Sequence, residues 1–352
     1  MSQPQRLVLA YPGDLEARTG GYLYDRRLAL ELEARGWLVE RMSLPPSFPF
    51  PAQADLAAAA DAFAALTPGA TLLVDGLALG AMPGLAAGLA AKHGLVALVH
   101  HPLCLETGLD AARATALAVS ERAALASATA TSVTSPRTAA SLIDLFDVPP
   151  ETVTVAVPGI DPAPVARGSG GHGRMICVGT ITPRKGHLIL IEALAGITDL
   201  AWEILIVGSP DRDPDAAAAL RAVIAAQAMQ ERVRLVGEIG PEALAALYRD
   251  ADLCVSASFY EGYGMALAEA LARGLPIVAA AGGAVADTVP ATAGLLVPTR
   301  HAEALREALR RFLTEPRLAA ALRTGALRAR EELPRWADTA RQVEAVLLRA
   351  RA

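Results

Sequence analysis

The chain has 352 residues, of which 53% are hydrophobic and 20% charged; this composition supplies apolar surface for two domains of ordinary size and excludes an intrinsically disordered chain. Its formal net charge is −5, with 10 basic and 16 acidic side chains in residues 1–165 and 22 and 21 in residues 166–352. Neither half has the positive excess that holds nucleic acid or an anionic membrane, so we expect no nucleic-acid partner and at most a weak, peripheral membrane contact.

Short apolar runs alternate with alanine-rich helical stretches through the first half of the chain. The runs predict strands at residues 6–10, 37–42, 70–75, 95–100, 129–134 and 152–157, with helices that include 21–35 and 110–127. This repetition of strand and helix predicts a parallel sheet that helices cover on both faces. The uncharged stretch 76–91 is shorter than the ~20 residues that a membrane span needs, so we expect a strand end followed by a helix there.

A proline- and glycine-rich segment without hydrophobic periodicity, residues 157–173, interrupts the pattern and predicts an exposed linker. Strands are then predicted at residues 175–178, 204–207, 233–236, 253–256, 277–280 and 295–297, and an amphipathic helix at 335–349. Two parallel α/β units joined by a linker predict a cleft between them. Sheets of this kind bind ligands at the carboxyl ends of their strands.

The cysteines and the N-terminal residues bear on the cellular compartment. Cys104, Cys177 and Cys254 lie far apart, which indicates neither a disulfide framework nor a zinc site, and we expect the last two in the core. The apolar run near the N-terminus is too short for a signal peptide, so we expect a cytoplasmic protein.

In the first half, candidate binding residues follow two predicted strands. Gly20 and Gly21 precede a helix, and a glycine pair lets a ligand approach the backbone closely. His100 and His101 follow the strand at 95–100, and Glu106 lies shortly after them. Because these positions fall at carboxyl strand ends, they are candidates for the cleft.

In the second half, two adjacent cations follow the strand at 175–178. The loop contains Gly179 and then Arg184 and Lys185, the latter being one of only two lysines in the chain. Cations at a carboxyl strand end can face a diphosphate. They would stabilise the charge that develops on its leaving oxygen when the bond to the diphosphate breaks.

The most informative segment is residues 261–278, which lies between two predicted strands. Glu261 opens a glycine-punctuated loop that leads into a helix, and Glu269 lies eight residues further on. The free N–H groups and positive dipole end of such a helix start favour an anion such as phosphate. Two carboxylates at this spacing can accept hydrogen bonds from the hydroxyls of two different sugar rings.

This segment, EGYGMALAEALARGLPIV, resembles the retaining glycosyltransferases of family 4, whose signature is two glutamates separated by seven residues. The resemblance implies the GT-B architecture, in which two Rossmann-like, doubly wound domains face an interdomain cleft. We expect an acceptor-side domain at residues 1–163, a nucleotide-sugar donor domain at 164–333, and a C-terminal helix at 334–352 that crosses back onto the first domain.

The resemblance also implies roles for individual residues. Glu261 is expected to contact the donor sugar and Glu269 its ribose. The donor phosphates are expected beside Gly179, Arg184, Lys185 and the amides of Gly262, Tyr263, Gly264 and Met265. Gly20 and Gly21 are expected near the acceptor. A histidine close to the anomeric carbon is expected at His100 or, in the other register, at His101; we favour His100. The family more often has His-Asp at this point, so the chain departs from it there.

The activity implied is transfer of a sugar from a UDP- or GDP-linked donor to an acceptor hydroxyl with retention of configuration. The acceptor is a small molecule, a glycan or a lipid-linked molecule, and front-face attack and double displacement both remain open. No metal is expected, because Arg184 and Lys185 neutralise the diphosphate. We expect the DRDPD segment at 211–215, which resembles a metal-binding motif, to be a loop whose aspartates cap a helix.

Other functions fit the same plan. A nucleotide-sugar epimerase, a sugar phosphorylase and a non-catalytic sugar-nucleotide-binding protein can share this architecture. A dinucleotide-dependent oxidoreductase would carry G-x-G-x-x-G after the first strand, where this chain has only Gly20 and Gly21.

Overall fold

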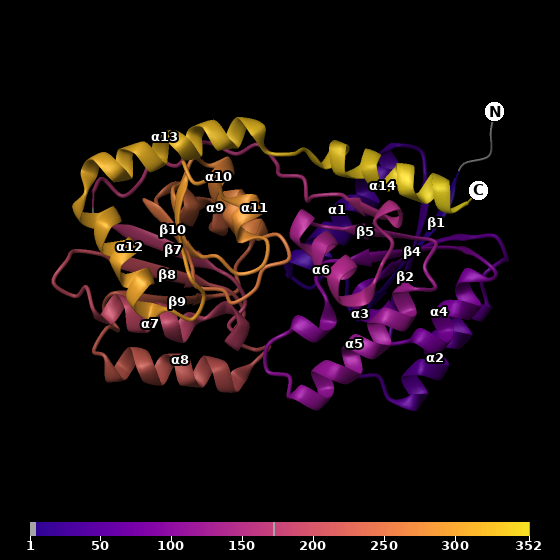
Figure 1. Ribbon diagram of the computed structural model, residues 1–352. Coiled ribbons are helices and arrows are strands. Elements are labelled where there is room, and N and C mark those ends of the chain that lie inside the picture. Colours follow the sequence, from indigo (N-terminus) through magenta and orange to yellow (C-terminus); the bar gives the residue numbers. More distant parts are fainter. Residues whose placement is uncertain (1–4, 172, 352) are drawn as a thin grey trace. The chain divides into compact units, whose positions relative to one another are not determined.

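The computed structural model describes residues 5–171 and 173–351 (Figure 1). The chain forms two compact units, one of Met1–Gly159 with Pro334–Ala352 and one of Ile160–Leu333. Each unit contains a six-stranded sheet in which all neighbouring strands pair in parallel. The two doubly wound α/β domains predicted from the sequence are confirmed.

The sheet of the first unit has the order β2-β1-β3-β4-β5-β6. Its strands are β1 (Arg6–Pro12), β2 (Leu38–Leu44), β3 (Thr71–Asp75), β4 (Gly94–Val99), β5 (Ala130–Val133) and β6 (Val153–Val155). The chain runs from β1 outward to β2 and returns on the other side of β1 to form β3. The strand order therefore reverses between β1 and β3, and in such sheets ligands bind beyond the carboxyl ends at this point.

Helices cover both faces of this sheet. The apolar cluster on one face includes residues of α2 (Gln53–Ala64), α3 (Gly76–Leu79), α4 (Pro83–Ala90), α5 (Ala111–Leu125) and α6 (Pro136–Phe146). On the other face α1 (Gly20–Ala34) packs against α14 (Trp336–Ala350), which also contacts β3 to β6. Two short 3-10 turns, η1 (Leu103–Leu105) and η2 (Pro150–Thr152), complete the unit.

The C-terminal helix α14 is part of the first unit. Its apolar stripe, which includes Trp336, Val343 and Leu347, is at most 5% exposed. Glu344 on α14 accepts hydrogen bonds from the indole N–H of Trp37 at 2.9 Å and from Arg35 Nε at 2.8 Å. The burial of this stripe explains why the helix packs where it does, since an amphipathic helix is stabilised by covering its apolar face.

The sheet of the second unit has the order β12-β11-β10-β7-β8-β9. Its strands are β7 (Arg174–Val178), β8 (Glu203–Val207), β9 (Val233–Gly237), β10 (Leu253–Ser256), β11 (Ile277–Ala280) and β12 (Gly294–Val297). The strand order reverses between β7 and β10. The loops after these two strands carry the candidate residues at 179–186 and 261–265.

Two apolar clusters lie on opposite faces of the second sheet. One includes residues of α7 (His187–Ala195), α8 (Pro214–Ala226) and α12 (Ala302–Thr314). The other includes residues of α9 (Pro241–Arg249), α10 (Met265–Ala272), α11 (Val285–Thr288) and α13 (Pro316–Glu332). Cys177 belongs to the first cluster and Cys254 to the second, so the prediction that both are core residues is confirmed. Burial raises the pKa of the Cys177 thiol to about 12.

Two local predictions were wrong. Residues 76–91 form two short helices, α3 and α4, rather than one, because Pro83 has no N–H to continue a helix and instead begins α4. The segment 157–173 is not exposed throughout its described part. Ala166 is 2% exposed, and its N–H donates to the carbonyl of Arg273 at 2.8 Å, so this stretch packs along the second unit.

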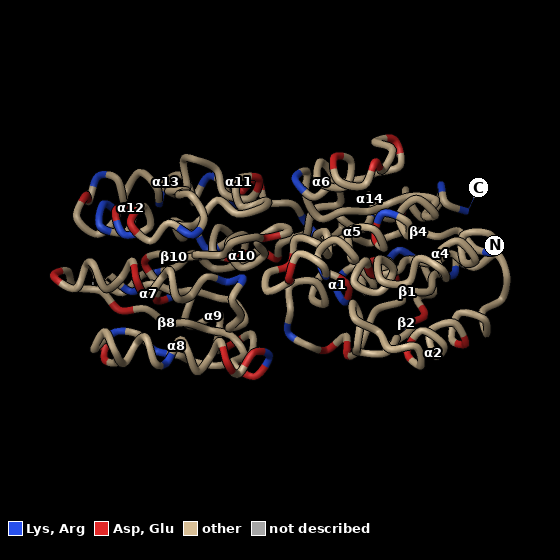
Figure 2. Tube along the Cα trace, turned by 60° about the horizontal axis from the view of Figure 1, so that its bottom comes forward, with Lys and Arg blue, Asp and Glu red and all other residues tan. Residues whose placement is uncertain are grey.

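Neither the distribution of charged side chains (Figure 2) nor the hydropathy of the helices indicates a membrane-spanning or strongly basic region in the described part of the chain. Lys and Arg residues are interspersed with Asp and Glu residues along both units (Figure 2). Within the described part of the chain, no helix combines the length and the apolar character needed to cross a membrane.

Candidate functional site

In the second unit, the loops after β7 and β10 touch each other at a glycine. Gly186 has a φ of 64°, and a Cβ at this position would lie 2.1 Å from the carbonyl oxygen of Ala257. The N–H of Phe259 donates to the carbonyl of Arg184 at 2.8 Å. Only glycine fits both the left-handed conformation and this close approach, so Gly186 fixes the position of the turn η3 (Pro183–Lys185) against the second loop.

The joined loops hold an ionic cluster. Lys185 Nζ lies 2.6 Å from Glu261 Oε1, and the guanidinium of Arg184 lies 3.8 Å from Glu261 Oε2. Arg184 also donates to the carbonyl of Tyr260 at 2.8 Å. Burial alone would raise the pKa of Glu261, but the charges of Lys185 and Arg184 outweigh it and lower the pKa. Glu261 is therefore ionised at neutral pH, and the cluster carries one net positive charge.

Gly179, at the carboxyl end of β7, leaves room for the lysine stem. A Cβ on Gly179 would lie 3.1 Å from Cε of Lys185. Gly179, Arg184, Lys185 and Glu261, which the sequence singled out separately, are thus brought together in one place. Their positions agree with the expectation that they act on one ligand.

A second glycine pair, which sequence reasoning missed, holds the backbone of Glu261. Glu261 forms a parallel bridge with Gly283, and Cβ atoms on Gly282 and Gly283 would each lie 2.3 Å from a carbonyl oxygen, of Phe259 and of Glu261 respectively. This pair could have been found from the sequence, because two adjacent glycines just after a predicted strand indicate a close backbone contact at the carboxyl end of the sheet.

The helix α10 begins at Met265 in the way the sequence predicts. Its N-cap is Gly264, with a φ of 95°, and no side chain caps the helix. The preceding Tyr263 is fixed through its carbonyl, which accepts a hydrogen bond from the hydroxyl of Thr288. The loop of Gly262, Tyr263 and Gly264 therefore leads into a helix start of the kind that attracts anions.

Glu269 lies further along α10 and is largely buried. Burial raises the pKa of its carboxyl group, and the effect is opposed by the charge of Arg273 and a hydrogen bond from Tyr248. The Arg273 guanidinium lies over the ring of Tyr248, 4.6 Å from its centroid. Arg273 also donates to the backbone carbonyl of Glu269 at 2.8 Å, on the same helix that Gly264 opens.

One aspartate of the segment 211–215 caps the helix α8. Asp213 is the N-cap of α8, and its carboxylate accepts a hydrogen bond from the N–H of Ala216 at 2.9 Å. The helix-capping role expected for this segment is confirmed for Asp213.

In the first unit, the doubled histidines take part in different contacts. Nε2 of His100 lies 3.1 Å from Oδ1 of Asp25, and Nε2 of His101 lies 3.1 Å from Oε2 of Glu106. Gly21 lies against the first of these rings, because a Cβ there would be 3.3 Å from Cδ2 of His100. The structure thus brings Gly21 and His100 together. Gly20 is the first residue of α1.

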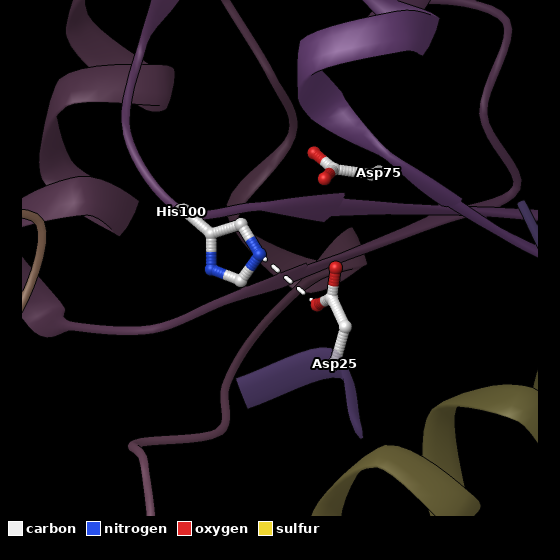
Figure 3. Close-up of side chains that lie close together, drawn as sticks. All are labelled: Asp25, Asp75 and His100. Carbon is white, nitrogen blue, oxygen red and sulfur yellow. Dashed lines mark hydrogen bonds and ion pairs between the residues drawn. The ribbon is translucent and has the colours of Figure 1, made fainter. Parts of the chain in front are cut away.

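Two buried carboxylates complete a group around His100 that sequence reasoning did not find (Figure 3). Asp25 is fully buried and Asp75 is 3% exposed. Together with His100 they offer three ligand atoms within 4.8 Å of one another, a donor set that divalent cations can accept. Asp75 could have been found from its place at the end of the buried strand β3, whereas Asp25 sits inside α1 and gave no signal.

Comparisons with known proteins bear on the family and the fold. Residues 172–315 match the model of the family described as glycosyl transferases group 1. The solved structure of sucrose-phosphate synthase from Thermosynechococcus elongatus has a TM-score of 0.82 and 25% identity, and the match covers 97% of this chain and 98% of that one. Residues 172–315 therefore carry a glycosyl transferases group 1 domain, and the whole chain has the GT-B fold of its solved neighbours.

Other relatives match a smaller part of this chain or at lower identity. The D-inositol 3-phosphate glycosyltransferases of Jonesia denitrificans and Salinispora arenicola are 31% and 32% identical over 228 and 215 residues, 59% and 54% of this chain. These matches cover 54% and 48% of the relatives, so the chain spans about half the length of the curated relatives it matches. Anabaena HepE, solved with UDP-glucose, has a TM-score of 0.77 at 16% identity, with 97% and 99% of the two chains covered, and shows the shared fold alone.

The family match covers the part of the chain that contains the ionic cluster and α10. The resemblance inferred from residues 261–278 is thereby confirmed at the level of family and fold. The group around His100 lies outside residues 172–315, so the family match does not bear on it, and only its geometry suggests a functional role.

Proposed function

We propose that this protein transfers a hexose from a UDP- or GDP-linked donor to an acceptor hydroxyl, with retention of anomeric configuration and without a metal ion. The observation that carries the proposal is the cluster of Arg184, Lys185 and Glu261 in the loops that adjoin the uncapped start of α10. These groups have the charges that a nucleotide diphosphate sugar needs.

The two cations supply the chemistry of the leaving group. When the glycosidic bond to the diphosphate breaks, negative charge grows on the departing oxygen. Arg184 and Lys185, fixed by their contacts with Tyr260 and Glu261, would stabilise that charge without reorganising. Because they neutralise the diphosphate, they replace the Mg²⁺ that would otherwise be needed.

The glutamates and the helix start would orient the rest of the donor. Ionised Glu261 accepts hydrogen bonds from sugar hydroxyls, the amides of Gly262 to Met265 face the sugar and phosphates, and Glu269 binds the ribose. Gly179 lets Lys185 reach this position.

The first domain is proposed to hold the acceptor, with Gly20, Gly21 and His100 beside it. The acceptor hydroxyl attacks from the face that the diphosphate leaves, which retains the configuration, and the departing phosphate oxygen takes its proton. The cytoplasm is the proposed compartment, which cell fractionation tests. The name of the curated relatives makes D-inositol 3-phosphate one acceptor to try.

The test is incubation of the purified chain with a panel of UDP- and GDP-sugars, with and without candidate acceptors, in EDTA. We expect release of UDP or GDP and, by NMR, a product with the anomeric configuration of the donor. Complete dependence on added metal or an inverted product would contradict the corresponding part of the proposal.

The same assay separates the rival functions. An epimerase would change the donor sugar without releasing nucleotide, and a phosphorylase would require phosphate or a nucleoside diphosphate as a substrate for cleavage. Nucleotide binding with no turnover of any donor would indicate a non-catalytic protein.

A further inference from the structure

His100 is held by its surroundings on several sides. Asp25 lies 3.1 Å from its Nε2, and the ring of Tyr24 meets it edge-on, with centroids 5.4 Å apart and an interplanar angle of 80°. Gly21 lies against the ring, and the backbone carbonyl of His100 accepts a hydrogen bond from Thr134 at 3.2 Å. A solvent-exposed loop histidine would not have so many contacts, so the orientation of the His100 ring is fixed by its neighbours.

The contact with Asp25 decides which ring nitrogen carries the proton. An ionised carboxylate can only accept, so Nε2 of His100 must be the donor and neutral His100 has an unprotonated Nδ1. Nδ1 lies on the side of the ring away from Asp25 and Asp75 (Figure 3) and has no hydrogen-bond partner among the described residues. The His100 side chain is 18% exposed and that of Asp25 is not exposed at all, so His100 is the accessible partner of the pair.

Asp75 determines how much charge the group carries. Oδ2 of Asp25 is buried without a hydrogen-bond partner among the described residues and points toward the Asp75 carboxyl group (Figure 3). Two buried carboxylates this close do not both ionise readily. Burial and the charge of Asp25 raise the pKa of Asp75 to about 7, against the opposing charge of His100.

We propose that Asp25 is a positioning residue for His100: it accepts the Nε2 proton and thereby presents Nδ1 as the atom that accepts a hydrogen bond from a substrate hydroxyl. The inference rests on the proposed function, because it names the atom through which His100 meets the substrate. The titratable groups that face His100 are Asp25 and Tyr24 on α1 and Asp75 at the end of β3.

The pH dependence gives a readout that a purely structural role would not move. Burial lowers the pKa of His100, but the charge and hydrogen bond of Asp25, with the charge of Asp75, raise it overall. Activity should rise with pH as Nδ1 becomes free to accept. Removing the charge of Asp25 should shift this limb of the kcat profile to lower pH.

The experiment compares Asp25→Asn and Asp75→Asn with the wild type. An asparagine amide can donate to Nε2 and so allow the wrong tautomer. Because a misoriented substrate hydroxyl can cost about 10²-fold in rate, we expect Asp25→Asn to lower kcat by about that factor. The KM for the donor should change less than threefold. Asp75→Asn removes the possible second negative charge and should leave the Nε2–H tautomer in place, so its loss of kcat should be smaller than that of Asp25→Asn.

A second measurement does not depend on activity. ¹⁵N NMR of the histidine rings, with His100 assigned by loss of its signals in His100→Gln, should show the Nε2–H tautomer in the wild type and a mixture or the other tautomer in Asp25→Asn. If the wild type transfers no sugar, the proposed function fails while this measurement still tests the Asp25–His100 pair.

Three results would overturn the inference. The first is an Nδ1–H tautomer in the wild type, and the second is an unchanged His100 pKa and kcat in a folded Asp25→Asn variant. The third is one equivalent of divalent metal that co-purifies with the wild type and is absent from both aspartate variants, because the group would then be a metal site.

Discussion

The two units carry their buried charges in opposite ways. In the second unit one carboxylate, Glu261, lies against two cations, and in the first unit two carboxylates, Asp25 and Asp75, lie against one histidine. The first arrangement lowers the pKa of its carboxyl group, whereas the second raises the pKa of Asp75 to about 7. The Glu261 cluster therefore keeps its charge through the neutral range, and the His100 group changes its charge there.

This difference fits different tasks. A diphosphate is an anion at every physiological pH, and a fixed positive cluster suits it. An acceptor hydroxyl is neutral and is oriented by a hydrogen bond, which depends on where protons lie. The comparison therefore predicts that substitutions in the two groups differ in size and in pH dependence.

The largest effect is expected for Lys185→Ala. Removing a fixed cation at the leaving oxygen should reduce turnover by roughly 10²–10³-fold, as loss of an oxyanion-hole donor does. Glu261→Ala should cause a loss of similar size, and the circular dichroism of both variants should remain native-like.

Lys92→Ala is the matched control, because Lys92 is the other lysine and lies exposed in the first unit. It should retain the wild-type rate. Activity of Lys185→Ala within about twofold of the wild type would remove the second unit's cluster from the mechanism.

A smaller effect, of the opposite sign, is expected for the stability of Asp75→Asn. The folded pKa of Asp75 lies above the ordinary value, so the wild type loses stability as pH rises from about 4 to about 7, where only the unfolded chain ionises. Asparagine keeps an oxygen that can accept the N–H of Leu77, which Asp75 Oδ1 accepts at 2.8 Å, and carries no charge.

The variant should thus have a Tm higher than that of the wild type by several degrees at pH 8 and a much smaller advantage at pH 4. Thermal unfolding at the two pH values provides the check. An equal difference in Tm at both would mean that Asp75 does not titrate in this range.

The Glu261 cluster could be predicted from the sequence more fully than the His100 group. All twelve strands of the described chain overlap predicted runs, and the strands inside the two sheets do so because parallel strands buried on both faces are apolar and short. The Glu261 cluster was predictable because its residues lie in two contiguous loops. Asp25 and His100 are 75 residues apart, and an acidic residue inside an amphipathic helix is normally solvated, so their pairing follows only from how α1 packs beside β4.

The smallest effect, a loss of kcat, is expected for Gly21→Ala. Because Gly21 lies against the His100 ring, this variant tests whether the reaction depends on the position of that ring. A Cβ at residue 21 would lie 3.3 Å from Cδ2 and 3.5 Å from Nε2 of His100, which is tight for a ring that Asp25 and Tyr24 hold from other sides. Gly21→Ala should therefore tilt the ring and weaken the contact with Asp25. We expect a roughly tenfold lower kcat, equivalent to about 1.4 kcal/mol.

The control for Gly21→Ala is Gly84→Ala, on α4 of the same unit, where an added Cβ meets nothing within 4 Å. That variant should keep its rate and gain slightly in stability, because alanine favours a helix more than glycine does. Combined with Asp25→Asn, Gly21→Ala should cost little further activity if both act through the position of His100. Fully multiplicative losses would instead show that Gly21 affects the reaction by a separate route, such as direct contact between the backbone and the acceptor.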